Sequence, residues 1–368
     1  MAPLRILITN HALAERTGSE LYVRDLATAL LRRGHAPIAF SPRLGEVARD
    51  LRSATVPVVD DLAAVAAPLD LIHGQHHLET MSALLHFPGV PAIFVCHGWL
   101  PPAEAPPKHP RIRRYVAVDH ACRDRLLLEN GIPEERLRVL LNFVDLERFK
   151  PRAPLPERPR RALVFSNYAA EQTCLAAARA ACAKAGIAVD AVGQRSGQVA
   201  ARPEDLLGRY DLVFAKGRSA LEALTVGCAV VLCDEAGAGP LVTVGGLDRL
   251  RPLNFGLRAL AEPVTPEVLA REIARYDAAD AAEVSRRIRS LAGRDLAVEA
   301  LVDLYKEVIA EQARLGLSDP QAEGSAASAY LLRAQRDFED RLRIARARRS
   351  PLRRAWDRLR GTRAFSGT

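Results

Sequence analysis

The sequence predicts an α/β protein with two Rossmann-like domains of doubly wound sheet that face a cleft, followed by a basic helical tail. Three observations predict this class. Short aliphatic runs alternate with longer helical patterns in both halves, a proline-rich charged segment separates the halves, and arginines gather after residue 330. At 368 residues the chain is long enough for two domains of ordinary size.

The first half is expected to form one parallel sheet, because its aliphatic runs are short and each is followed by a helical pattern. The expected strands are 5–9, 36–40, 69–73, 92–96, 115–118 and 138–141, and the expected helices are 20–33, 78–85 and 121–129. The segment "PRAPLPERPRR" at 151–161 then indicates a linker, since proline and charge disfavour a packed element.

A second alternation follows the linker. Its expected strands are 162–166, 188–192, 212–215 and 230–233, with helices at 171–184, at 203–210 and within 266–314. We therefore expect an N-terminal domain at 1–152, a linker at 153–161, a C-terminal domain at 162–316 and a tail at 317–368. Because such sheets bind ligands at the carboxyl ends of their strands, we expect the two domains to meet at a cleft.

Composition points to a cytoplasmic protein. Hydrophobic residues make up 49% and charged residues 26%, no apolar stretch is long enough to span a membrane, and the N-terminus lacks a signal-peptide pattern. None of the six cysteines forms a CxxC pair, so reduced core thiols are expected. The segment 330–368 holds twelve arginines and four acids, a net +8 that equals the charge of the whole chain.

Histidines and glycines at strand ends are the first candidates for chemistry. His73, His76 and His77 stand together, but no second ligand cluster accompanies them, so a polar cleft edge is favoured and no metal is expected. His97 follows an apolar strand and is either a cleft residue or a satisfied core histidine. Gly18, followed by Ser19, opens a helix whose N-terminus can face an anion or can simply turn the chain.

The segment "DLVFAKGRSALEALTVGCAVVLCDEAGAGP" at 211–240 places several candidates close together. A strand ends at two cations, a short helix with one acid follows, and a glycine-rich stretch closes the segment. Its candidate binding residues are Lys216, Arg218, Ser219, Glu222, Gly237, Ala238, Gly239 and Pro240. Two interpretations stay open here: an anion site, or solvated cations with Glu222 merely paired to Arg218 at helical spacing. Arg195, after another strand, could reach the same anion or be a solvated loop residue.

The order of these pieces resembles the family 4 glycosyltransferases of the two-domain GT-B fold, over roughly residues 4–312. The strings that carry the resemblance are "TGSELYVRDLATALLRRGH", "IFVCHG", "YVAVDHACRDRLLLENGIPEERLRVLLNFVDLERFKP" and "SALEALTVGCAVVLCDEAGAGPLV". The third string is the most specific. The resemblance implies transfer of a sugar from a nucleotide-sugar donor to a glycan or glycolipid acceptor of the bacterial envelope type, with retention of configuration and without a metal or other cofactor.

The resemblance also implies roles for particular residues. Gly18 would lie against the donor diphosphate, His97 near the reacting sugar, and Glu222 on the ribose hydroxyls. The 237–240 stretch would be a loop whose backbone amides approach the donor. Alternative functions are a nucleotide-sugar 2-epimerase, which shares the two-domain arrangement, and a transfer-inactive nucleotide-sugar-binding or scaffold protein.

The chain departs from the family pattern in three places. Phe214 stands where the family has the first of two paired glutamates, "FSNYAAEQTC" replaces a basic passage after the first strand of the second domain, and Phe143 follows Asn142 where glycine is preferred. These departures leave the fold prediction intact and put the handling of the donor in doubt.

The tail carries an apolar seam at alternating steps of four and three residues, interrupted at Pro351. Its positions are Leu331, Gln335, Phe338, Leu342, Ala345, Arg349, Leu352, Trp356 and Leu359. A basic helix of this kind suits an anionic membrane surface at the inner face of the cytoplasmic membrane, or a partner helix. Nucleic acid is not expected, because no aromatic residues alternate with the cations.

Overall fold

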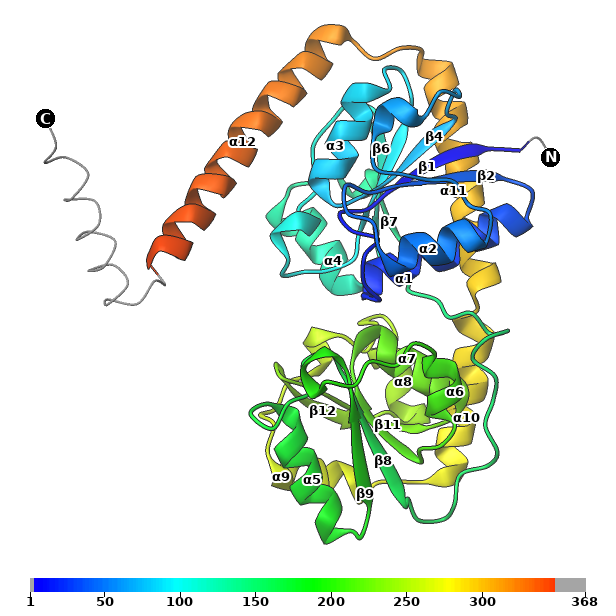
Figure 1. Cartoon of the computed structure of the whole chain (residues 1–368), viewed down its shortest axis with the longest axis vertical. Helices are drawn as coiled ribbons and strands as arrows, with labels where there is room; N and C mark the ends of the chain where they lie inside the picture. The colour runs from blue at the N-terminus through cyan, green and yellow to red at the C-terminus, as the bar shows by residue number, and fades with distance from the viewer. Residues whose placement is uncertain (1–2, 348–368) are drawn as a thin grey trace, which may run out of the picture. The chain divides into compact units, whose positions relative to one another are not determined.

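The computed structural model describes residues 3–347 and has the predicted α/β class, with two sheets and their covering helices (Figure 1). Within the described residues, one compact unit holds the chain up to residue 106 together with 111–316, and a second unit holds 107–110 together with the chain from 317 onward. Both sheets belong to the first unit. The tail positions Arg349, Leu352, Trp356 and Leu359, and Pro351, lie outside the described residues.

The first sheet has seven strands in the order β3-β2-β1-β4-β5-β6-β7, all of them parallel. The strands are β1 (Arg5–Thr9), β2 (Ala36–Phe40), β3 (Val58–Val59), β4 (Leu71–Gln75), β5 (Ala92–Cys96), β6 (Ile112–Ala117) and β7 (Leu137–Val139). Its helices are α1 (Gly18–Arg32), α2 (Glu46–Ser53), α3 (His77–His86) and α4 (His120–Asp124). The central strands β4 and β5 are buried at every position, and β5 is apolar throughout, because helices cover both faces of the sheet.

The second sheet has five strands in the order β12-β11-β10-β8-β9. Its strands are β8 (Arg161–Phe165), β9 (Ala188–Val192), β10 (Leu212–Ala215), β11 (Ala229–Asp234) and β12 (Gly237–Leu241), and only the β11–β12 pair is antiparallel among them. Its helices are α5 (Cys174–Lys184), α6 (Pro203–Leu207), α7 (Gly217–Val226), α8 (Leu247–Leu250), α9 (Pro266–Ile273) and α10 (Ala278–Leu291). The sheet is therefore a doubly wound core with one antiparallel edge.

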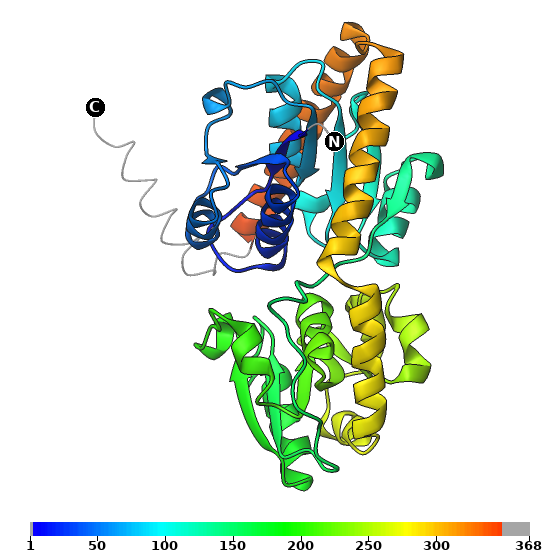
Figure 2. The same cartoon turned by 90° about the vertical axis from the view of Figure 1, so that its right-hand side faces the viewer.

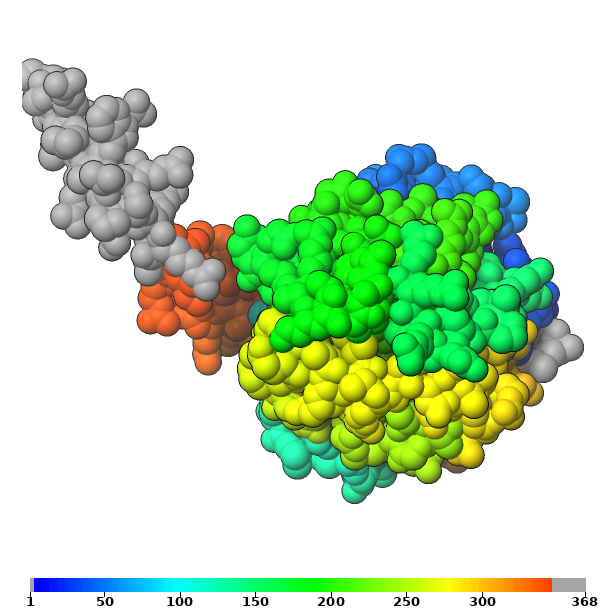
Figure 3. All heavy atoms as spheres, turned by 90° about the horizontal axis from the view of Figure 1, so that it is seen from below, coloured from blue at the N-terminus to red at the C-terminus, as the bar shows by residue number. Residues whose placement is uncertain are grey.

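Alternate residues of β10 face opposite layers of the second domain. Leu212 and Phe214 pack in the core under α5 and α9, while Val213 and Ala215 pack in the core under α7 and α10. Figure 1 shows these two helical layers on either side of the sheet. Seen from below, the green and yellow residues of this domain form a closely packed surface (Figure 3). Phe214 is thus a core residue, which explains why no acid stands at its position.

The last helix of the first unit, α11 (Arg294–Leu315), packs against the first sheet, contrary to the expectation that helices within 266–314 all complete the second domain. It contacts α1 and β5, and the Tyr305 hydroxyl lies 2.7 Å from Nδ1 of the buried His73. Gln312 Oε1 accepts a 3.0 Å hydrogen bond from Nε of Arg113 on β6. Figure 2 shows α11 in gold beside the strands of the first domain. The expected boundaries at 152 and 162 stay a prediction.

Four helices or strands were absent from the sequence prediction: α2, β3, β12 and α8. The strand β3 has only two residues, too few for a periodic signal. The strand β12 was predicted as a glycine loop. Its glycines instead allow close packing, since a Cβ on Gly239 would lie 2.3 Å from the carbonyl oxygen of Ala259. Strand propensity did not predict β12, because its glycines are required by the close approach of another part of the backbone and not by side-chain packing.

The helix α12 (Pro320–Ala347) belongs to the second unit. Tyr330 is buried, whereas Leu331, Phe338 and Leu342 on the predicted seam are 62%, 63% and 40% exposed. Among residues 3–347, no helix is long and apolar enough to cross a membrane.

Candidate functional site

A cavity of about 190 Å³ lies where four strands of the second sheet end. Residues that follow β8, β9 and β10, together with the last residue of β11, form one side of it. The N-terminal turn of α1 and Arg148 form the other side. The carboxyl edge of a parallel sheet is where such folds bind ligands, so the cavity is the candidate site.

Cations outnumber carboxylates in the wall of the cavity. Among the described residues, the charged groups that line it are Arg16, Arg24, Arg148, Lys216, Arg218, Glu222 and Asp234. The first residues of α1 and α7, Gly18 and Gly217, also lie at or next to this wall, so the positive dipole ends of two helices lie in the same region. The arrangement is suited to an anion with more than one charge.

The first helix N-terminus is held by a capping box. The Thr17 hydroxyl donates to Glu20 Oε2 at 2.8 Å, and the backbone N–H of Thr17 donates to the same oxygen at 3.0 Å. Glu20 Oε1 accepts from the backbone N–H groups of Ala14 and Glu15. The buried Glu20 therefore fixes the turn before α1, and Thr17 is the N-cap residue of the helix.

On the opposite side, Lys216 is oriented by a buried carboxylate. Lys216 Nζ forms an ion pair with Asp234 Oδ2, and Asp234 Oδ1 accepts a 2.7 Å hydrogen bond from the Ser166 hydroxyl. The Lys216 ammonium also lies 5.5 Å from the centroid of the Tyr168 ring. These contacts hold a cation on the cavity wall in one place.

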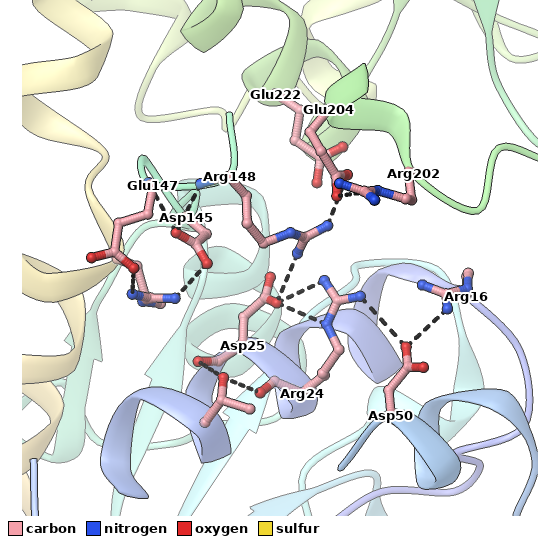
Figure 4. Close-up of polar contacts among 12 residues, drawn as sticks. Arg16, Arg24, Asp25, Asp50, Asp145, Glu147, Arg148, Arg202, Glu204 and Glu222 are labelled. Atoms are coloured by element: carbon pink, nitrogen blue, oxygen red, sulfur yellow. Dashed lines mark hydrogen bonds and ion pairs between the residues drawn. The ribbon is translucent and has the colours of Figure 1, made fainter. Parts of the chain in front are cut away.

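Arg218 and Glu222 lie one turn apart on α7, and Arg218 Nε donates to Glu222 Oε1 at 2.8 Å. Arg218 also forms an ion pair with Asp25 of α1, a buried acid that receives Arg148 as well (Figure 4 shows the Asp25 contacts of Arg24 and Arg148). Burial raises the pKa of Glu222 and outweighs the opposing charge of Arg218. The helical pair of the second interpretation thus exists, but Arg218 is largely buried and both residues line the cavity, and the anion-site interpretation stays a prediction.

Five of the predicted site residues line the cavity: Gly18, Lys216, Arg218, Ser219 and Glu222. Of the described residues, Ser19, His97 and Arg195 lie outside its wall. Arg195 donates to Glu235 at 2.7 Å and lies 5.0 Å from the Tyr168 ring centroid, so it is held behind the site.

The predicted loop of Gly237, Ala238, Gly239 and Pro240 also lies outside the wall, and here the prediction of a loop was wrong. The segment is the edge strand β12, in which Ala238 pairs with Cys233 and also forms a bridge to Glu262. The backbone N–H of Ala238 donates to the Glu262 carbonyl, and the Ala238 carbonyl accepts from the N–H of Glu262. Contacts between this segment and the donor stay a prediction, and the strand pairing does not favour them.

His97 lies at the end of β5 in a polar cluster of the first domain. Its backbone N–H donates to Glu104 at 2.8 Å, its ring packs edge-on against Tyr22 at a centroid distance of 4.5 Å, and Nε2 is buried without a hydrogen-bond partner. Burial lowers the pKa of His97 to about 4, so the imidazole is neutral at pH 7. The same cluster accommodates His76, whose Nε2 lies 3.3 Å from Glu104 Oε1.

Sequence reasoning missed four of the charged wall residues: Arg16, Arg24, Arg148 and Asp234. Arg16 precedes the capped turn of α1 and Arg24 lies eight positions later on the helix, a spacing that was not distinguishable from an ordinary solvated helix face. Asp234 is the last residue of the apolar strand β11. A polar residue at the end of an apolar strand usually lies at the carboxyl edge of the sheet, so this signal was present in the sequence.

The two doubly wound sheets and the ionic cavity at their strand ends define the GT-B class. Several solved structures share this fold. A glycosyltransferase from Rickettsia africae superposes with a TM-score of 0.63 at 15% identity, covering 84% of this chain and 99% of that one. The HepE protein of Anabaena, solved with UDP and glucose, has a TM-score of 0.58 at 15% identity, covering 82% and 99%. A candidate UDP-N-acetylglucosamine 2-epimerase from Listeria monocytogenes has a TM-score of 0.53 at 13% identity, covering 83% and 96%.

Part of the chain also resembles a known family by sequence. Residues 16–148 match the family model for Glycosyltransferase Family 4, a stretch that runs from the turn before α1 to Arg148 of the cavity wall. No curated protein matches the chain by sequence. The chain is therefore similar to family 4 glycosyltransferases over this stretch, and its fold is the fold of the solved glycosyltransferases described above.

Proposed function

We propose that the protein transfers a sugar from a nucleotide-sugar donor to an acceptor hydroxyl, with the donor diphosphate in the cavity between α1 and α7. The observation that supports this most is the charge of the cavity wall, where five cationic side chains face two carboxylates beside two helix N-termini. A nucleotide sugar carries two phosphate charges, and the leaving diphosphate gains charge as the bond to the sugar breaks. The HepE structures with UDP and glucose and with UDP-glucose support the same class of donor.

The chemistry follows from where charge develops. The bond between the anomeric carbon and the diphosphate oxygen breaks, its electron pair stays on the diphosphate, and the acceptor oxygen bonds to the anomeric carbon and loses its proton. Lys216 and Arg218 lie where they would stabilise the departing diphosphate more strongly than the bound donor. Glu222, with a second carboxylate oxygen beside the one that Arg218 occupies, is proposed to accept the ribose hydroxyls.

We propose that these cations make a resident metal unnecessary and that the reaction retains the anomeric configuration, as the family resemblance implies. The first proposal is tested by measuring transfer with a chelator present, and the second by determining the anomeric configuration of the product by NMR. A requirement for added divalent metal, or an inverted product, would overturn the respective proposal.

The acceptor is proposed to be a glycan or glycolipid of the bacterial envelope type, reached at the inner face of the cytoplasmic membrane. Support comes from the tail, where the apolar seam of α12 is exposed and the segment 330–368 carries a net +8. A basic amphipathic helix of this kind binds anionic lipid surfaces.

The donor is identified with a panel of UDP-, GDP- and ADP-sugars in a thermal-shift measurement. A ligand present at 100 times its Kd stabilises the folded state by about 2.7 kcal/mol, so binding of one nucleotide class is detected as a rise in Tm. The proposal then requires that the sugar of that donor appears on an acceptor. Binding followed by isomerisation of the sugar would instead indicate an epimerase, and binding without turnover would indicate a scaffold protein.

A further inference from the structure

Asp25, on the second turn of α1, lies at the centre of three arginines. Arg24 donates to its Oδ1 from Nε at 3.0 Å and from a terminal nitrogen at 2.7 Å, and Arg148 donates to the same oxygen at 3.3 Å (Figure 4). Arg218 donates to the other oxygen, Oδ2. All three guanidinium groups line the cavity, whereas Asp25 is 2% exposed and, among the described residues, is not part of the wall.

The charge state of the buried Asp25 carboxyl group is set by burial and by the three arginines. Burial alone would raise the pKa of Asp25, but the charges of Arg218, Arg24 and Arg148 outweigh it and hold the pKa below its ordinary value. Asp25 is therefore ionised at neutral pH. The three arginines come from α1, from the segment after β7 and from α7 of the second domain, and a single acid fixes all of them.

Asp25 orients each of the three guanidinium groups and leaves part of their N–H donors available to a ligand. Arg218 uses Nε for Glu222 and a terminal nitrogen for Asp25, and Arg148 uses its other terminal nitrogen for Glu204 at 3.0 Å. Each guanidinium has five N–H donors, so these contacts orient the groups without exhausting them. The side chains stay partly exposed toward the cavity, at 12%, 26% and 14% for Arg24, Arg148 and Arg218.

We infer that Asp25 is a positioning residue for the donor: it gathers Arg24, Arg148 and Arg218 around the subsite of the second phosphate. This inference rests on the proposed function. It also accounts for a departure noted in the sequence, since Phe214 is a core residue and supplies no second carboxylate beside Glu222. In this chain the carboxylate that shares Arg218 with Glu222 comes from the first domain.

The test compares nucleoside mono- and diphosphates on the full chain and on Asp25→Asn. The measured quantity is the factor by which the second phosphate tightens binding, which is the ratio of the Kd for the monophosphate to the Kd for the diphosphate of the base that binds. Loss of oriented, charge-assisted hydrogen bonds should lower this ratio about 10-fold or more, while the Kd of the monophosphate changes little. A residue with only a structural role would weaken both ligands alike and leave the ratio unchanged.

Three further variants serve as controls and as a second test. Asp211→Asn is the matched control, because Asp211 is a buried acid that pairs with Arg152 at the opposite end of β10 from Lys216. It should lower Tm and leave the ratio at its wild-type value. Asp25→Glu keeps the charge and should restore at least part of the ratio. Should Asp25→Asn fail to fold, Arg148→Gln removes one gathered cation that is only partly buried, and it must lower the same ratio.

The outcomes separate the inference from the proposed function. A wild-type chain that binds no nucleotide overturns both. A wild-type chain that binds diphosphates more tightly than monophosphates, with Asp25→Asn and Arg148→Gln showing the same ratio, overturns the inference alone. A lowered ratio in both variants, with Asp211→Asn unchanged, establishes Asp25 as the positioning residue.

Discussion

Glu222 Oε1 accepts a hydrogen bond from Nε of Arg218, one helical turn earlier on α7, at 2.8 Å. The pair occupies the first turns of a ten-residue helix that starts at the carboxyl end of β10. Glu222 thus has two tasks in the proposed site: it orients a cation with one oxygen and is available to a ligand hydroxyl with the other. Burial raises the pKa of Glu222, and the charge and hydrogen bond of Arg218 oppose that rise.

Glu222→Gln should weaken donor binding and leave the fold intact. The amide keeps the shape of the side chain but loses the charge that pairs with Arg218 and the acceptor capacity of one oxygen. We expect the KM for the donor to rise about 10-fold, in line with a hydrogen bond to a charged group. The control is Glu272→Gln, a buried acid of the same domain that accepts the backbone N–H of Leu241. Unchanged KM and kcat in Glu222→Gln would remove this residue from the site.

His97→Ala should lower kcat about 100-fold if the imidazole orients or polarises the reacting sugar, a range typical of such groups. The unpartnered Nε2 of His97 is what motivates this prediction, since a buried ring nitrogen without a partner is unusual in a purely structural role. The measurement is kcat at saturating donor and acceptor, alongside Tm. A lower Tm with normal turnover would favour the core-histidine interpretation.

The protein should lose stability as pH falls below the ordinary titration range of histidine. Burial lowers the pKa of His73 to about 3, while in the unfolded chain the group titrates near 6.5. Between these values the unfolded state binds a proton that the folded state does not. The free energy of unfolding therefore rises with pH through this window, by up to about 1.4 kcal/mol per pH unit, and is lost on acidification.

Urea unfolding between pH 7 and pH 4.5 checks this prediction, with His73→Gln as the test variant. The variant should show a shallower acid dependence than the wild type, because one of the groups that must titrate on unfolding is gone. His86→Gln, at an exposed position, should keep the wild-type slope. Equal slopes in the wild type and His73→Gln would show that His73 does not carry the effect.

Gly193→Ala should destabilise the second domain. Gly193 has a φ of +153°, and a Cβ there would lie 1.8 Å from the carbonyl oxygen of Ser166, so the ends of β8 and β9 would have to separate. A cost of about 3 kcal/mol or more is expected. Gly197→Ala, also at positive φ but with open space around it, should cost only about 1–2 kcal/mol. Similar losses in the two variants would exclude the steric explanation.

Much of the fold could be predicted from the sequence because the sheet strands are nearly continuous apolar runs. The strands at 5–9, 36–40, 92–96 and 188–192 were predicted to the residue, since all are bounded by turns or helical patterns. The packing of α11 on the first sheet was not predictable from periodicity. The apolar face of a helix is visible in the sequence, but the pattern does not indicate which sheet that face packs against.

The candidate site was predictable only where its residues follow a strand directly. Lys216 and Arg218 come just after β10, so the sequence indicates the sheet edge on which they lie. Asp25 lies within α1 among residues of an ordinary amphipathic helix, next to the oppositely charged Arg24. The proposed role of Asp25 depends on Arg218, 193 positions away, and no local sequence pattern indicates a contact between residues so far apart in the chain.

Removal of residues 331–368 should abolish binding to anionic vesicles and leave transfer to a small soluble acceptor nearly intact. The truncation keeps the buried Tyr330 and removes the exposed seam positions Leu331, Phe338 and Leu342. Every residue that lines the cavity comes before position 235, so the donor site keeps all its groups. The measurements are co-sedimentation with vesicles that contain anionic or only zwitterionic lipid, and turnover with the soluble acceptor.

The salt dependence of vesicle binding distinguishes charge from apolar contact in the full chain. Cations at a lipid surface contribute about 1 kcal/mol each and are screened over a Debye length of about 8 Å at physiological ionic strength, so binding should weaken as salt is added. Replacing Phe338 and Leu342 by serine keeps all the charge of the tail, and it should weaken binding at every salt concentration if the seam inserts into the lipid.

A truncated chain that binds anionic vesicles as well as the full chain would contradict the membrane proposal. A truncation that changes the oligomeric state, with no effect on vesicles, would assign the seam to helix pairing, because exposed apolar positions at steps of four and three residues also suit a second helix.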